Sequence, residues 1–146
     1  MKKILSLLIV TLAFCTVYVN AEEMQFTQKE LYIKQILENN YNYSANGFFE
    51  AIKDGNYKYV DLFIKSGMDP NTTCMKVPAL FFAIKQKQPS IVDRLLAAGV
   101  NPNQKFMKQT PLATAIITKN AETVNTLIKH GANVNDESLG MYPLNY

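Results

Sequence analysis

Apolar residues in the last third of the chain have the spacing of two short amphipathic helices joined by a tight turn. Each helix places them at positions i, i+3 and i+4, which form one helical face. The two faces consist of Leu112, Ala115 and Ile116, and of Val124, Leu127 and Ile128. Thr110 suits an N-cap, Pro111 the first helical position, and Gly131 the left-handed residue after the second helix. So small a unit cannot bury both faces alone, and the pattern therefore predicts neighbouring units.

The same unit occurs three times at a period of 32 residues. The phrases SGMDPN, AGVNPN and HGANVN begin at Ser66, Ala98 and His130, and the same Ala-Ile pair precedes each phrase by the same distance. A fixed period of this size is typical of stacked repeat proteins. The repeats are predicted at about 46–77, 78–109 and 110–141, with a partial fourth at 142–146. Asn46 is the predicted N-cap of the first one, by its alignment with Thr110.

These residues resemble the ankyrin repeat, whose pattern is approximately TPLHxAA, a short turn, then xxVxxLLxxGAxxN. The best matches are Thr110-Pro111-Leu112 with Ala115, and the run LLAAG at 95–99 leading into Asn103. The resemblance covers about residues 46–146. It implies an all-α solenoid of stacked helix–turn–helix units with short β-hairpin-like loops.

The sequence departs from the ankyrin pattern at two places. The His of TPLH is replaced by Phe49, Phe81 and Ala113. The glycine expected at the hairpin tip occurs only as Gly140, while Lys76 and Lys108 stand at the matching positions of the other units. Beside these tips, Met75, Met107 and Leu139 recur at the period as apolar residues, which favours packing of one hairpin against the next over contact with a partner.

The first 21 residues have the form of a secretory signal peptide. Lys2-Lys3 precede an apolar run from Ile4 to Val19, and Val19 and Ala21 suit positions −3 and −1 of a cleavage site. The alternative is an uncleaved membrane anchor, for which the run is short. We therefore expect cleavage after Ala21 and export of the mature protein to a periplasm or beyond, without a membrane anchor.

Residues 22–45 lie outside the repeat register. Thr27 and Glu30 have the spacing of a capping box, and the apolar pattern after them predicts a helix from about Gln28 to Glu38. We interpret this segment as a cap over the exposed face of the first repeat, which stacked arrays need at their ends. A tyrosine-rich arm that binds a partner is the alternative.

Charge and composition give no support for catalysis or for nucleic-acid binding. The chain is 48% hydrophobic with a net charge of +3, and thirteen basic and twelve acidic residues remain after removal of the leader. The mature chain has one cysteine, Cys74, which is either free or paired with another molecule, and one histidine, His130, expected at the surface of a helix end. No cluster of residues predicts a catalytic, cofactor or metal site, so we expect a non-enzyme.

The ankyrin resemblance implies binding through the hairpin tips and the inner face of the first helices. The residues at those positions are Lys53, Asp54, Met75, Val77, Phe82, Lys85, Gln86, Phe106, Met107, Gln109, Ile117 and Thr118. Phe106 and Ile117 are the strongest candidates, because they are apolar where most of the aligned residues are polar. Phe82 aligns with Glu50 and Thr114 and is expected to be exposed.

The predicted function is therefore non-catalytic recognition of an unidentified protein. One hypothesis is a periplasmic adaptor or stabiliser of a resident protein, and the alternative is a secreted effector that binds a protein of another cell. A third hypothesis is that the protein is a purely structural remnant of a longer array. Because the fourth repeat is incomplete, self-association through an uncapped C-terminal end is a further expectation.

Overall fold

A computed structural model of the chain describes residues 27–136. Its helices are α2 (Gln28–Glu38), α3 (Ala45–Lys53), α4 (Tyr57–Lys65), α5 (Ala79–Lys85), α6 (Pro89–Ala97), α7 (Pro111–Ile117) and α8 (Ala121–Lys129). The strands β1 (Thr73–Cys74) and β2 (Val77–Pro78) form an antiparallel hairpin in which Cys74 pairs with Val77. The predicted signal peptide at 1–21, the partial fourth repeat at 142–146, and Leu139 and Gly140 lie outside the described residues.

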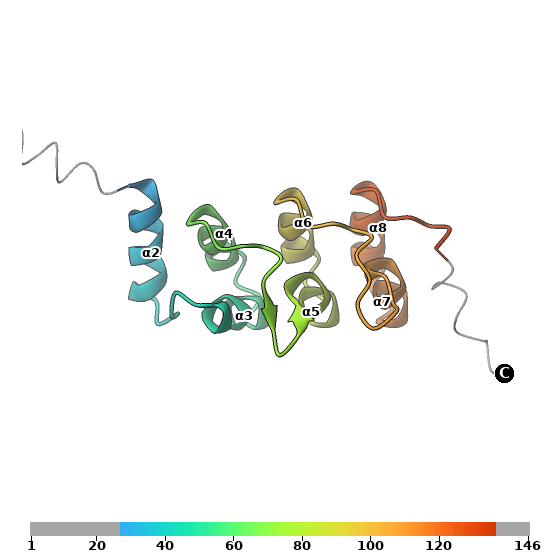
Figure 1. The fold of residues 1–146 in the computed structure, drawn as a ribbon, viewed down its shortest axis with the longest axis horizontal. Coiled ribbons are helices and arrows are strands. Elements are labelled where there is room, and N and C mark those ends of the chain that lie inside the picture. The colour runs from blue at the N-terminus through green and yellow to red at the C-terminus, as the bar shows by residue number, and fades with distance from the viewer. Residues whose placement is uncertain (1–26, 137–146) are drawn as a thin grey trace, which may run out of the picture.

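The helices form two rows that run along the array (Figure 1). The inner row consists of α3, α5 and α7, and the outer row of α4, α6 and α8, with each inner helix packed against the outer helix that follows it. Within each row, each helix contacts the next, so the units stack side by side. The result is the all-α solenoid predicted from the repeats. No helix between residues 27 and 136 combines the length and apolar character needed to cross a bilayer.

The helix starts follow local hydrogen-bonding chemistry. The side chain of Thr110 accepts a hydrogen bond from the Ala113 amide at 3.3 Å, as its predicted N-cap role requires. The prediction that Asn46 caps the first repeat is wrong. The hydroxyl of Ser44 instead accepts from the Gly47 amide at 3.2 Å, and α3 begins two residues before the aligned position. Ser44 is therefore the N-cap of α3, in place of the aligned Asn46.

The recurring phrase after each outer helix forms the same turn three times. Gly67, Gly99 and Gly131 have φ values of 95°, 95° and 87°, in the left-handed region that glycine adopts without strain. Two residues later, an Asp or Asn side chain accepts from the backbone amide two positions ahead, at 2.8–2.9 Å in all three units. Asn103 also links two units, because its side-chain oxygen accepts from the Asn133 amide at 2.7 Å.

The core lies between units and repeats with them. The aligned residues Phe48, Leu80 and Leu112 are 0%, 0% and 2% exposed. Phe63, Leu95 and Leu127 of the outer row are fully buried as well. By contrast, Ile116 is 51% exposed, although the aligned residues Ile52 and Ile84 are fully buried. Burial at that position therefore depends on the following unit.

The N-terminal segment packs against the first repeat, as the cap interpretation predicts. Helix α2 contacts α4, with Ile36 fully buried. The ring of Tyr43 stacks 5.8 Å from that of Phe63, and its hydroxyl donates to the Ser66 carbonyl at 3.0 Å. Tyr41 donates to Asp54 at 2.9 Å, and burial together with this bond raises the pKa of Tyr41. The tyrosines of the linker thus contact the fold.

Polar contacts join the outer helices. Arg94 on α6 donates to the Asp61 carboxylate on α4 at 2.7 Å, and Lys65 contacts the same carboxylate at 2.7 Å. On the next pair of helices, His130 lies 2.8 Å from Asp93. Burial raises the pKa of Asp61, but the hydrogen bonds from Lys65 and Arg94 outweigh it, so the pKa lies below its ordinary value.

Leu96 and Ile128 offer a matched test of stacking, because they occupy the same repeat position but are 6% and 45% exposed. We expect Leu96→Ala to lower the free energy of unfolding by about 2–4 kcal/mol, because it leaves a cavity between units. Ile128→Ala should cost less than about 1 kcal/mol, because that side chain is already partly in water. Urea unfolding measures both, and equal losses would contradict burial by stacking.

The lowered pKa of Asp61 predicts a pH dependence. Its ionised form stabilises the fold above the ordinary carboxyl pKa, and this contribution disappears as pH falls through the lower pKa of the folded state. We expect Asp61→Asn to lower the free energy of unfolding by about 1–2 kcal/mol at pH 7. The difference between the variant and the wild type should shrink at pH 3 and below. A difference that is independent of pH in urea titrations would show that the ion pair does not contribute.

Candidate functional site

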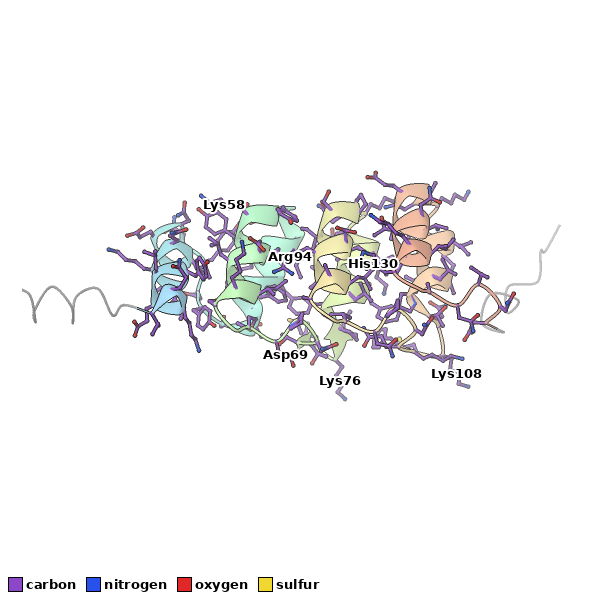
Figure 2. The ribbon with its side chains drawn as sticks, turned by 90° about the horizontal axis from the view of Figure 1, so that it is seen from above. Lys58, Asp69, Lys76, Arg94, Lys108 and His130 are labelled. Atoms are coloured by element: carbon purple, nitrogen blue, oxygen red, sulfur yellow. The ribbon has the colours of Figure 1, made fainter. Side chains whose placement is uncertain are left out.

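The structure places the twelve predicted contact residues on the inner row, its turns and the hairpins, which together form what is here termed the inner surface. Seven are exposed: Lys53, Asp54, Met75, Lys85, Gln86, Met107 and Ile117. Five are half-buried: Val77, Phe82, Phe106, Gln109 and Thr118. Phe82, which was expected to be exposed, packs its ring 5.2 Å from that of Phe49. Figure 2 shows Lys76 and Lys108 projecting from the same edge of the array.

The hairpin tips are two-residue turns with an unusual backbone. Met75 and Lys76 have φ values of 50° and 68°, and Met107 and Lys108 have 50° and 66°. Two consecutive left-handed residues define the type I′ turn, which favours Asn-Gly because other side chains are strained there. The turn closes the second hairpin as well, where Phe106 and Gln109 exchange backbone hydrogen bonds of 2.9 and 3.0 Å. Both tips therefore keep strained residues where glycine fits better.

The expectation that the tip methionines pack between hairpins is wrong for the two described ones. Met75 is 93% exposed and Met107 is 79% exposed. In a type I′ turn both central residues sit at the end of the hairpin and point away from the strands, so periodic recurrence does not imply burial. Each tip thus presents a thioether and a lysine to solvent.

A shallow groove of about 250 Å³ brings several of the predicted residues together. It lies between α3 and the β1–β2 hairpin, and one residue comes from α5. Its lining consists of Asn46, Phe49, Glu50, Lys53, Cys74, Met75 and Phe82. Lys53, Met75 and Phe82 were predicted as contact residues, whereas the part played by the α3 face at Asn46, Phe49 and Glu50 was missed. Their i, i+3 and i+4 spacing is the available signal.

The small side chain at position 74 leaves the groove open. Cys74 occupies the position that Phe106 occupies in the next unit. There the Phe106 ring packs 5.3 Å from Phe81, which aligns with Phe49, and fills the corresponding space. The smaller Cys74 side chain does not fill this space, and its thiol donates to the Asn46 side-chain oxygen at 3.6 Å. The Phe106 side chain is therefore half-buried against its own unit. The space that is open to a partner lies beside Cys74.

The inner row and the hairpins are positively charged. Their charged residues are Glu50, Lys53, Lys76, Lys85 and Lys108, a net charge of +3. All four lysines are exposed, and none lies within ion-pair distance of a carboxylate belonging to residues 27–136. In the outer row, by contrast, Lys65 and Arg94 share Asp61. The lysines of the inner row and hairpins thus face solvent without an ion-pair partner among residues 27–136.

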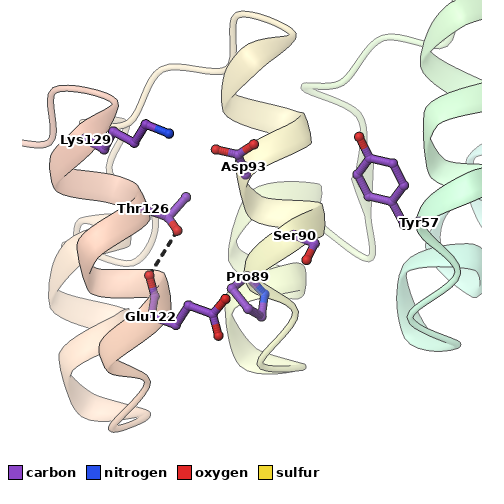
Figure 3. Close-up of a pocket in the computed structure, with 7 residues that line it drawn as sticks. All are labelled: Tyr57, Pro89, Ser90, Asp93, Glu122, Thr126 and Lys129. Atoms are coloured by element: carbon purple, nitrogen blue, oxygen red, sulfur yellow. Dashed lines mark hydrogen bonds between the residues drawn. The ribbon is translucent and has the colours of Figure 1, made fainter.

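A second, larger hollow of about 540 Å³ lies on the outer row (Figure 3). It is lined by Tyr57, Pro89, Ser90, Asp93, Glu122, Thr126 and Lys129. Its side chains are mostly polar and of mixed charge, and Asp93 is already in contact with His130. The smaller groove is the better candidate because it combines an aromatic floor with unpaired charge.

Residues 27–136 contain no group of three or more His, Cys, Asp or Glu side chains that could hold a metal ion. The thiol of Cys74 belongs to the groove, and His130 caps the end of α8 on the outer row.

Comparison with known protein families identifies the class of this fold. Residues 80–146 match the family model described as ankyrin repeats (3 copies). Residues 80–146 are therefore ankyrin repeats, as the resemblance to the ankyrin pattern predicted. A search of curated proteins finds no match. Ankyrin repeats are in general protein–protein interaction modules, and their fold is a non-catalytic one.

The strain at the tips can be measured directly. Replacing Lys76 by glycine removes the left-handed penalty of about 1–2 kcal/mol, and the greater freedom of glycine in the unfolded chain offsets part of it. We expect Lys76→Gly to raise the free energy of unfolding by about 0.5–1 kcal/mol. Lys85→Gly, inside α5, should instead lower it by up to about 1 kcal/mol. Destabilisation by both variants in urea titrations would contradict the type I′ geometry.

Proposed function

We propose that this protein is an exported, non-catalytic interaction module that holds another protein on its inner surface. In the cell it acts as a periplasmic adaptor or stabiliser of a resident protein. The observation that carries the proposal is the groove beside Cys74, where an aromatic floor lies next to a hairpin tip with two exposed side chains on a left-handed backbone. The signal-peptide pattern at residues 1–21 supports export.

The hairpin tips support the same surface. A flexible, polarizable methionine in full contact with water adapts well to an apolar partner. Met75 and Met107 occupy equivalent places one unit apart, so a partner that spans two units meets both. The strain at these tips supports a functional interpretation, because strained backbone tends to persist where it serves a site.

A secreted effector that binds a protein of another cell is the alternative role for the same surface. The signal-peptide pattern suits both, since either protein leaves the cytoplasm. The compartment in which the mature protein accumulates distinguishes them. Retention with the periplasmic fraction supports the adaptor, and accumulation in the medium or in a neighbouring cell supports the effector.

Site-specific photo-cross-linking in living cells tests the proposal. A photoreactive residue in place of Met75 should give one dominant protein adduct, because that position is 93% exposed beside the groove. The matched control places the same residue at Glu122, which is exposed on the outer row. We expect no adduct from Glu122. Adducts of equal yield from both positions, or none from Met75, would place the interaction elsewhere. Fractionation of the cross-linked cells then assigns the compartment.

A further inference from the structure

We infer that the groove beside Cys74 binds one aromatic or leucine side chain from an acidic segment of the partner protein. The inference rests on the proposed function, because it names the chemistry of the partner at the same surface. It follows from the size of the groove, the charge around it and the single residue that keeps it open.

The groove has the size and lining of a side-chain pocket. Its volume of about 250 Å³ lies below the range of about 300–1,000 Å³ that is typical of small-molecule sites. Phe49 and Phe82 form its floor with ring centroids 5.2 Å apart, and Met75 stands beside them. A large apolar side chain can therefore leave water against rings and a thioether, which is how anchor residues bind in protein interfaces.

Three lysines without an ion-pair partner among residues 27–136 line the groove or lie close in sequence to residues that line it. Lys53 lines the groove, Lys76 follows Met75 at the hairpin tip, and Lys85 lies one turn after Phe82 on the same face of α5. Glu50 is the one acidic residue among the charged side chains of the inner helices and hairpins that the structure describes. A partner segment with carboxylates on both sides of its anchor therefore meets positive charge in each direction.

A protein segment fits better than a nucleic acid. Nucleic acids combine phosphate contacts with bases stacked on open aromatic faces. Here Phe49 is only 6% exposed and packs against Phe82, so little of its ring is available for a base to stack on. Short acidic peptides with one apolar residue satisfy both the charge and the groove.

The second unit shows that the groove can be closed without changing the fold. Phe106 fills the aligned space by packing on Phe81, which aligns with Phe49. A phenylalanine at position 74 therefore has a structural precedent one unit away. Of the two hairpins that the structure describes, the one at Cys74 leaves this space open and the one at Phe106 fills it, so the two units are not equivalent for a partner segment.

The probe is a fluorescent peptide of sequence Asp-Glu-Asp-Phe-Asp-Glu-Asp. The protein is the full chain as the cell produces it, after any cleavage of the signal peptide. We expect this peptide to bind at least about tenfold more tightly than the same peptide with alanine at its centre, since burial of one phenylalanine has that effect. Binding should weaken as salt is raised, because the lysines are exposed. Anisotropy titrations give each dissociation constant.

Variants separate the groove from the charge. Cys74→Phe should lower affinity for the phenylalanine peptide at least about tenfold, to the level of the alanine peptide. Cys74→Ser keeps a small side chain and should bind like the wild type. Lys53→Glu should weaken binding of both peptides, whereas Lys129→Glu on the outer row should not. Thermal melts confirm that each variant is folded.

A readout that needs no variant keeps the inference testable. The bound anchor should shield the Cys74 thiol, so saturating phenylalanine peptide should slow its alkylation by a maleimide at least about fivefold, as mapped by mass spectrometry. Equal affinity for both peptides, with Cys74 unshielded, would overturn the inference. Stronger competition by a single-stranded oligonucleotide than by a matched acidic peptide would do so in favour of a nucleic acid. In either case a cross-link at Met75 would still support the proposed function, whereas its absence would contradict binding at the inner surface.

Discussion

Each unit of this protein can bury its apolar face only against the next unit, and the rest of the structure depends on that constraint. Phe48, Leu80 and Leu112 are buried because each lies in the interior of a stack of two rows. Such burial is worth about 1.5–3 kcal/mol for a side chain of this size. It is available only if the period is kept, since a shift by one residue moves the apolar face away from its neighbour. The repeated glycines and Asx turns end each outer helix at the same point and so maintain the period.

This dependence on the period explains which features the sequence could predict. Helix positions, turn glycines and the Thr110 cap follow from local chemistry repeated in register, and the structure confirms them. Capping at Ser44 could not be predicted from the alignment, because the first unit joins a tyrosine-rich linker that the other units lack. Exposure of Met75 was missed for another reason. Recurrence at the period indicates a shared position, and at a hairpin tip that shared position is in solvent.

The candidate site, unlike the core, depends on a residue that departs from the repeat pattern. Its residues were only partly predictable because the groove results from a departure from the repeat, and a departure is visible only once the neighbouring unit shows what normally fills the space. Aligning Cys74 with Phe106 gives a large difference in side-chain volume. Whether that difference leaves a groove depends on Phe49 and Phe82, whose rings meet across two helices. No pattern within one helix contains that information.

Departures of this kind give a repeat protein its specificity at small cost to the fold. In a stack with nearest-neighbour contacts, a change at one interface affects mainly the two units that form it. Opening the space at Cys74 therefore leaves the contact between Phe81 and Phe106 within the second unit intact, and α5 and α6 continue to pack against α7 and α8 of the third unit. The lysines need no such compensation, because exposed charge costs little in water. A binding surface can thus change at single positions of the array while the stacking residues, and the stability they provide, remain as they are.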